Sequence, residues 1–318
     1  MSTATPDVSK RRAWLMAARP QTLPAGSAPV IVGAGIAAHD GVFAPVPWLA
    51  ALVGALLIQI GTNFANDYYD AVKGADTDER EGFTRVTAGG LLPPAQVKYA
   101  MAGTYGLAVL VGIYLVAIGG LPILVVGLTS IVAGILYTGG PYPYGYRGLG
   151  DLFVFVYFGV VAVTGTYYVQ AVAGAGTGLV PIGIPAGTVT AAAVTASLPA
   201  AGLSTAILVV NNVRDRETDR KAGKRTLAVL LGYRFSRIEF LALVGMAYVV
   251  PLVFALDSRF GLPALAPLLS LPLAASVTKT VLTRTDGEAL NPALERVGQT
   301  LFVHSLLFAT GLALPTVL

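Results

Sequence analysis

Two polar segments of the chain repeat one arrangement of amide and carboxylate side chains. The first begins at Asn66 and reads NDYYDAVKG, and the second begins at Asn211 and reads NNVRDRETD. Residues three or four apart project from one face of a helix, so each segment presents two aspartates together. The two pairs are Asp67 with Asp70 and Asp215 with Asp219. If the pairs face each other, they form a strongly negative pocket that needs cations.

The chemistry that such a pocket favours is the binding of Mg²⁺ together with a phosphate group. Carboxylates without histidine or cysteine prefer hard ions, and Mg²⁺ above all where a phosphate supplies further oxygen ligands. Basic side chains near both segments can neutralise phosphate oxygens directly. They are Lys73, Arg80, Arg85, Arg147, Lys224 and Arg225. The alternative, that these acids are solvated loop charges beside membrane spans, conflicts with the cost of acids near hydrocarbon.

The bilayer is the solvent that the composition predicts for the elements carrying these segments. Of 318 residues, 55% are hydrophobic and 12% are charged, and the mean hydropathy is +0.70. A helix of about 20 apolar residues crosses a hydrocarbon core of about 30 Å. The expected helices are 22–39, 45–66, 96–118, 121–138, 150–173, 187–211, 237–256, 262–282 and 297–317. We therefore expect an all-α integral membrane protein of about nine transmembrane helices, a single domain over 1–318 with a short cytoplasmic segment 1–20.

The distribution of basic residues predicts how these helices are oriented. Of the 21 lysines and arginines, all but Arg259 fall in segments on one side of the expected bundle. Cytoplasmic loops carry such an excess, so the N-terminus and both acidic segments are expected in the cytoplasm and the C-terminus outside. The net charge of +4 then reflects topology, and neither a nucleic acid nor a soluble protein partner is indicated.

Some chemistry is excluded by what the chain lacks. It has no cysteine and two histidines, His39 and His304, which are isolated from each other in the sequence. Disulfides, thiolate metal sites and histidine-based catalysis are therefore not expected. The repeat, which extends to Arg80 and Arg225, predicts two related four-helix halves around a central cavity, with one additional helix.

These residues resemble the UbiA-type intramembrane prenyltransferases, which carry N-D-x-x-D-x-x-x-D after the second helix and D-x-x-x-D after the sixth. The likeness covers nearly the whole chain and is closest to the branch that prenylates 1,4-dihydroxy-2-naphthoate in menaquinone synthesis. The segments that carry it are WLMAARPQTLPAGSAPVIVG from Trp14, NDYYDAVKGADTDER from Asn66, YRGLGD at 146–151 and NNVRDRETDRKAGKRTLAVLLG at 211–232. One departure is visible, because Gly74 stands where the family motif has its last aspartate.

The resemblance implies a Mg²⁺-dependent transfer of a polyprenyl group from polyprenyl diphosphate to 1,4-dihydroxy-2-naphthoate. Carbon dioxide and diphosphate leave, demethylmenaquinone forms, and the enzyme lies in the bacterial plasma membrane with its active site facing the cytoplasm. The catalytic residues would be Asp67, Asp70, Asp215 and Asp219, which would also bind the metal. Asp76 or Asp78 would replace the missing motif aspartate as a further metal ligand. Asn66 would join the basic residues that bind the diphosphate.

An aromatic ring can stabilise the allylic carbocation of such a reaction by its quadrupole. The expected acceptor or carbocation pocket contains Tyr69, Tyr137, Asn211 and Asn212. The group that assists ionisation of the acceptor hydroxyl stays open among Asp151, Lys224 and a metal-bound water. Three alternatives also stay open: a secondary transporter, a lipid phosphotransferase, and a prenyltransferase for another acceptor such as 4-hydroxybenzoate.

Overall fold

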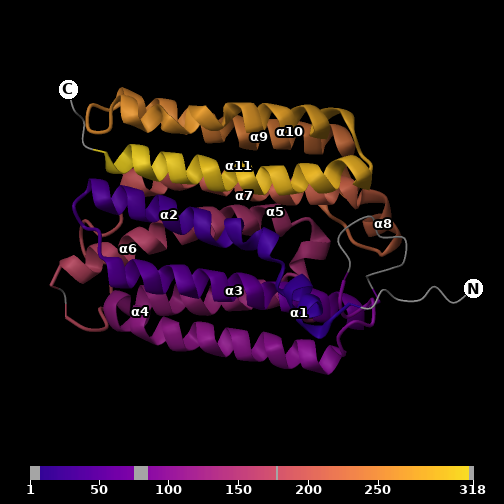
Figure 1. Cartoon of the computed structure of the whole chain (residues 1–318). Coiled ribbons are helices and arrows are strands. Elements are labelled where there is room, and N and C mark those ends of the chain that lie inside the picture. Colours follow the sequence, from indigo (N-terminus) through magenta and orange to yellow (C-terminus); the bar gives the residue numbers. More distant parts are fainter. Residues whose placement is uncertain (1–7, 75–84, 177, 315–318) are drawn as a thin grey trace, which may run out of the picture.

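The chain folds into a bundle of long helices. A computed structural model describes residues 8–74, 85–176 and 178–314, and no β-strand occurs among them. Figure 1 shows most helices lying side by side along a common direction. Within the described residues, six helical segments are long and apolar enough to cross a membrane: Pro45–Val72, Pro94–Leu136, Gly150–Gly174, Ala191–Arg214, Leu227–Leu256 and Leu262–Thr283. The all-helical membrane architecture is thus confirmed.

The first helices follow the apolar pattern of the sequence. A short helix, α1, precedes them, and the Ser9 hydroxyl caps it by accepting the Arg12 N–H at 3.4 Å. The expected helix 45–66 extends to Val72, so the first acidic pair lies within a continuous helix. The bounds are α1 (Lys10–Ala18), η1 (Pro20–Thr22), α2 (Leu23–His39), α3 (Pro45–Val72) and α4 (Pro94–Leu136).

The long segment α4 contains a break at Gly120, between the expected helices 96–118 and 121–138. Gly120 has φ +66° and ψ −150°, which only glycine adopts at low cost. The N–H of Leu121 donates to the Pro181 carbonyl at 2.9 Å. A Cβ on Gly120 would lie 1.7 Å from the same carbonyl oxygen, so any other residue would displace the loop that packs there.

The middle of the chain contains one continuous helical segment with a π-helical turn. It comprises α5 (Gly150–Phe155), η3 (Val156–Val161) and α6 (Ala162–Gly174). At this turn a Cβ on Gly159 would lie 2.1 Å from the Ala201 Cβ of α7 (Ala191–Arg214). Small residues allow such close backbone contact between membrane helices, and π-helical turns are frequent at functional sites.

Two helices in the last third begin earlier than hydropathy predicts. The Thr226 hydroxyl caps α9 by accepting the Val229 N–H, and Asp286 caps α11 by accepting the Ala289 N–H at 3.0 Å. Both helices therefore begin ten residues before the expected starts at 237 and 297. The bounds are α8 (Arg216–Lys221), α9 (Leu227–Leu256), η4 (Leu262–Ser270), α10 (Leu271–Thr283) and α11 (Gly287–Ala313).

The packing of the bundle brings the two acidic segments to one end. α3 packs on α4, α2 on α11, and α7 on α9, and α7 is the most buried of the membrane-spanning candidates. Figure 1 shows α1 and α8 at the same end of the bundle. This end therefore contains the last turn of α3 and the junction of α7 with α8.

Candidate active site

The first acidic pair lies in the last two turns of α3, and both side chains are buried. Asp67 is 1% exposed, and its Oδ2 accepts hydrogen bonds from the Thr87 N–H at 3.1 Å and the Thr87 hydroxyl at 2.6 Å. The guanidinium of Arg19 lies 3.6 Å from the other carboxylate oxygen. A buried carboxylate is tolerated only when it is compensated in this way.

Asp70 is also 1% exposed and receives partners from three separate parts of the chain. Arg85 donates to its Oδ2 at 3.0 Å, and the Tyr146 hydroxyl donates to its Oδ1. The Lys224 ammonium lies 3.9 Å from Oδ1. Asp70 therefore connects the end of α3 to both the α4–α5 connection and the segment after α8.

The second acidic pair is built differently, because the helix does not continue through it. α7 ends at Arg214, and Asp215 has φ −90° and ψ 4° between α7 and α8. The Asp219 N–H still donates to the Asp215 carbonyl at 2.7 Å, which retains one helical hydrogen bond across the break. Arg214 holds the Asp215 carboxylate with two hydrogen bonds, at 2.8 and 2.7 Å.

Lys224 brings the two motifs together. Its ammonium lies 3.9 Å from Asp70 and 3.8 Å from Asp219, so a single cation contacts one carboxylate of each motif. The same ammonium lies 4.7 Å from the centroid of the Tyr146 ring. The Tyr146 carbonyl in turn accepts the Arg225 N–H at 2.8 Å. The acids of the two motifs thus face each other across positive charge.

A cavity of about 190 Å³ lies beside these carboxylates. Its lining contains Arg19, Arg85 and Arg214, the three arginines that pair with Asp67, Asp70 and Asp215. The remaining lining residues include Gln59 and Asn211 as amides and Val154, Phe158, Ile207, Leu208 and Leu294 as apolar side chains. A space with guanidinium groups and an apolar wall suits a ligand with an anionic head and a hydrocarbon part.

Several predicted diphosphate residues have other contacts in the structure. The Lys73 ammonium donates to the carbonyls of Thr138 and Gly140, at 2.6 and 3.0 Å. Asn66 accepts the Thr138 hydroxyl at 3.0 Å, and the Arg147 guanidinium lies 3.8 Å from the centroid of the exposed Tyr142 ring. Arg225 is exposed and contributes its backbone N–H. Asp76, Asp78 and Arg80 lie outside the described residues.

The predicted pocket residues divide into two groups. Asn211 lines the cavity and accepts a hydrogen bond from Arg214 at 2.7 Å, whereas Asn212 is buried and is not part of that lining. The rings of Tyr69 and Tyr137 pack closely on the backbones of Gly139 and Gly145, where a Cβ would lie 2.7 and 3.0 Å from them. Neither tyrosine belongs to the cavity lining.

Tyr137 nevertheless lies within electrostatic range of both motifs. It follows the last residue of α4, and its ring meets Tyr144 edge to face at 5.5 Å. Burial, and after it the negative charge of Asp151, raise the pKa of Tyr137 well above its ordinary value, with Tyr144, Asp219 and Asp70 adding to the shift. The phenol therefore keeps its proton at neutral pH.

The carboxylates fit a magnesium ion that is shared with a phosphate ligand. Among the described residues, no group of three or more acidic or histidine side chains is close enough to hold a metal. Mg²⁺ is typically held by one or two carboxylates together with substrate phosphates. Lys224, at 3.9 Å from Asp70 and 3.8 Å from Asp219, already compensates part of the negative charge that would face such an ion.

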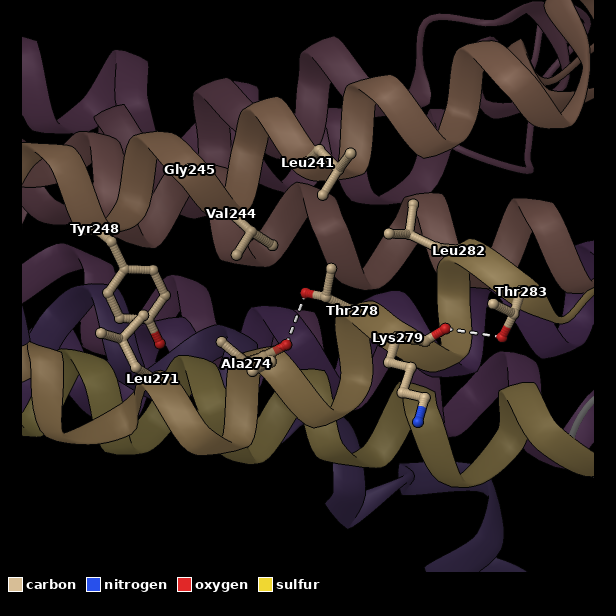
Figure 2. A pocket seen from close by; sticks show the side chains of 11 residues that line it. Leu241, Val244, Gly245, Tyr248, Leu271, Ala274, Thr278, Lys279, Leu282 and Thr283 are labelled. Carbon is tan, nitrogen blue, oxygen red and sulfur yellow. Dashed lines mark hydrogen bonds between the residues drawn. The ribbon is translucent and has the colours of Figure 1, made fainter.

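A larger hollow of about 620 Å³ lies between α9 and α10, and it contains no acidic residue. Figure 2 shows its side chains, among them Val244, Tyr248 and Leu282, with Lys279 as the one charged residue of the lining. The Thr278 and Thr283 hydroxyls donate to carbonyls of their own helix. The lining of this hollow thus lacks the paired carboxylates and guanidinium groups that surround the smaller cavity.

Four residues that contact the acids were not predicted as site residues: Arg19, Thr87, Tyr146 and Arg214. Two of them carried a usable signal, since Arg214 directly precedes Asp215 and Arg19 precedes Pro20 at the start of the first apolar stretch. Arg19 also adopts a left-handed conformation with φ +51°, and such outliers cluster at functional sites. Tyr146 begins the YRGLGD segment that carries the family resemblance, although its contact with Asp70 was not predicted, and nothing in the sequence around Thr87 indicated a contact with Asp67.

Comparison with known proteins agrees with this geometry. A model described as the UbiA prenyltransferase family matches residues 27–306. The 1,4-dihydroxy-2-naphthoate octaprenyltransferase of Escherichia coli (strain K12) is 38% identical over 316 residues, which cover 96% of this chain and 97% of that protein. The protein of the same name from Mycobacterium tuberculosis (strain ATCC 25618 / H37Rv) is 38% identical over 302 residues, with 94% and 96% covered.

Solved structures share the fold at low sequence identity. The apo structure of a UbiA homolog from Aeropyrum pernix K1 superposes with a TM-score of 0.64 at 13% identity, covering 88% of this chain and 97% of that one. A UbiA homolog from Archaeoglobus fulgidus, bound to DMAPP and Mg²⁺, gives 0.57 at 15% identity, with 93% and 98% covered. By the family match and the two bacterial relatives, the chain belongs to the UbiA prenyltransferase family.

Proposed function

We propose that the protein transfers a polyprenyl group from polyprenyl diphosphate to 1,4-dihydroxy-2-naphthoate, with loss of carbon dioxide. The observation that carries the proposal is the cavity in which Arg19, Arg85 and Arg214 meet beside the aspartates of both motifs. The choice of acceptor rests on the relatives that bear this activity in their names. The product is the reduced form of demethylmenaquinone, an intermediate of menaquinone synthesis.

In this reaction the three arginines bind the diphosphate oxygens, because a guanidinium offers two parallel donors to them. Lys224 contributes a further positive charge between the motifs. The sequence prediction adds Asn66, Lys73, Arg80, Arg147 and Arg225 to the proposed diphosphate set. Together these groups neutralise the charge that develops on the leaving group as the allylic carbon–oxygen bond breaks.

The aspartates would hold Mg²⁺ in this site. The proposed ligands are Asp67, Asp70, Asp215, Asp219 and Asp76. A bound Mg²⁺ supplies Lewis-acid stabilisation of the departing diphosphate. The protein side chains position the carboxylates for this role through Thr87 and Tyr146, which donate to Asp67 and Asp70.

The apolar wall of the cavity would receive the prenyl chain and keep water from the allylic cation. Val154, Phe158 and Leu208 supply part of this wall. Exclusion of water strengthens every electrostatic interaction in the site and prevents hydrolysis of the cation. Tyr69, Tyr137, Asn211 and Asn212 complete the proposed acceptor and cation pocket, in which an aromatic face stabilises positive charge.

We also propose nine membrane crossings within a single domain. The count takes α4 as two crossings separated at Gly120 and adds α2 and α11 to the remaining candidate spans. Two related four-helix halves would then bring the two motifs to one face. The excess of basic residues at that face supports a cytoplasmic active site in a bacterial plasma membrane.

The test is product formation by the purified protein in detergent with Mg²⁺ and a radiolabelled polyprenyl diphosphate. Either 1,4-dihydroxy-2-naphthoate or 4-hydroxybenzoate is supplied as acceptor, and products are separated by chromatography. We expect a prenylated naphthoquinone product from the first acceptor alone. Transfer to 4-hydroxybenzoate instead would contradict the proposed acceptor, and no transfer to either would contradict the proposed function.

A further inference from the structure

One buried carboxylate near the site takes no part in the pairing of the two motifs. Asp151 is the second residue of α5 and is 5% exposed. Its Oδ1 atom is buried without a hydrogen-bond partner in the described part of the chain. A buried acceptor without a donor destabilises the folded protein, and more so when the group is charged. Such an atom suggests a donor that arrives with a ligand.

The position of Asp151 on its helix directs it toward the cavity side of α5. Val154, which lines the cavity, follows it by three residues on α5, the spacing of one helical face. The neighbouring Gly150 approaches Leu208, another lining residue, where a Cβ would lie 3.3 Å from its side chain. Asp151 is therefore one helical turn from the cavity lining, toward the end that holds both motifs.

Tyr137 links Asp151 to the site. A Cβ on Gly150 would lie 3.5 Å from the Tyr137 hydroxyl, and burial, followed by the negative charge of Asp151, raises the pKa of that phenol. The negative charges of Asp219 and Asp70, one acid from each motif, also raise the pKa of this phenol. Asp151 thus shares an electrostatic neighbour with both motifs while it belongs to neither.

We propose that Asp151 is a catalytic residue that binds a hydroxyl of the aromatic acceptor and takes its proton during transfer. This inference rests on the proposed function. The proton moves to Asp151 as the ring carbon bearing the carboxylate attacks the allylic carbon, whose bond to the diphosphate oxygen breaks. The ring then holds a carbonyl beside the carbon that carries both the prenyl and the carboxylate group.

The remaining steps follow from that β-keto acid. The carbon–carboxylate bond breaks, carbon dioxide leaves, and the electron pair returns to the ring to form an enolate. Asp151 gives its proton back to the enolate oxygen and is regenerated as a carboxylate. Atoms, charges and electrons balance without an oxidant, and the product is the quinol.

A purely structural role for Asp151 predicts different behaviour. An acid in the first turn of a helix is favoured by the partial positive charge of that end. Loss of that stabilisation would lower the thermal midpoint and affect both substrates alike. A role in acceptor activation instead affects the acceptor step alone.

The experiment compares Asp151→Asn with a matched control, Glu239→Gln. Glu239 is a half-buried acid on α9 within electrostatic range of Asp151. For Asp151→Asn we expect kcat with 1,4-dihydroxy-2-naphthoate to fall about 100-fold or more, the range for loss of a general base. The KM for polyprenyl diphosphate and the affinity for geranylgeranyl thiodiphosphate with Mg²⁺ should stay within twofold, and Glu239→Gln should resemble the unchanged protein.

Two outcomes would overturn the inference: transfer by Asp151→Asn within threefold of the unchanged protein, or a parallel loss of thiodiphosphate affinity. If the asparagine variant does not fold, Asp151→Ser carries the same test, because serine is well tolerated at helix starts. Failure of the unchanged protein to prenylate the naphthoate in this assay would instead contradict the proposed function.

Discussion

The two aspartate motifs neutralise their buried charge in different ways. The first takes its partners from distant parts of the chain, with Arg19 beside Asp67 and Arg85 beside Asp70. In the second, Asp215 pairs with the adjacent Arg214. The first motif is therefore complete only when several elements have assembled, whereas the second forms its central ion pair locally. Related sequence patterns thus produce one long-range site and one short-range site.

Removal of divalent metal should have the largest effect, because both motifs depend on it in the proposed reaction. We expect EDTA to lower transfer by about a thousandfold, since metal stabilisation of several kcal/mol corresponds to that factor. Addition of Mg²⁺ should restore the rate. Labelled product measured over a Mg²⁺ titration checks this, and activity that is indifferent to the metal would contradict the assignment of the aspartates.

Asp70→Asn should be the most damaging substitution in either motif. The substitution removes the negative charge that Arg85, Tyr146 and Lys224 all contact. We expect kcat to fall about 10²- to 10³-fold, as for loss of one electrostatic group in an active site. Steady-state kinetics in detergent measures this. Asp40→Asn is the control, because Asp40 is an exposed acid that accepts the Tyr167 hydroxyl at 2.7 Å; a comparable loss there would indicate general destabilisation.

Asp215→Asn should cost less, about 10- to 100-fold in activity, the usual range for disturbed metal ligation. Arg214 would keep its hydrogen bonds to Asn211 and Asn291, at 2.7 and 2.9 Å, and so stay in place. A Mg²⁺ titration of this variant beside Asp70→Asn compares the two motifs directly. Equal losses and equal shifts in half-saturating Mg²⁺ would show that the local and the long-range site contribute alike.

Thr87→Val should have the smallest effect on activity and a measurable one on stability. The substitution removes the hydroxyl that donates to Asp67 at 2.6 Å while the backbone N–H bond remains. We expect a loss of about 1.5–3 kcal/mol in unfolding free energy, as for a hydrogen bond to a charged group. Thermal unfolding checks this against Thr129→Val, whose exposed hydroxyl bonds its own helix at 2.7 Å and should not matter.

Hydropathy predicted the apolar middle of the helices and missed where some of them begin. The expected 22–39 and the observed Leu23–His39 nearly coincide, because apolar residues fill that helix to both ends. α9 and α11 begin ten residues earlier than expected, at starts set by caps at Thr226 and Asp286. The added part of α9 is apolar up to a break at Gly232, where φ is +83°, whereas the added part of α11 is largely polar. The capping residues were visible in the sequence, so a search for caps would have moved both boundaries.

The acids of the site were predictable, but most of their partners were not. Asp67, Asp70, Asp215 and Asp219 were selected from repeated spacing. Thr87 and Tyr146 reach these acids through tertiary contacts over 20 and 76 residues of chain. No local pattern encodes contacts of that range, which arise only when helix ends meet in the folded bundle.

The break at Gly120 has a consequence for how substitutions in this protein would be interpreted in a genetic screen. The residue has a backbone conformation and a carbonyl contact that no side chain tolerates, yet it lies in α4 away from every acid of the site. Inactive alleles at this position would report failed insertion or assembly. Protein abundance in the membrane, measured beside activity, separates such alleles from those that disable the chemistry.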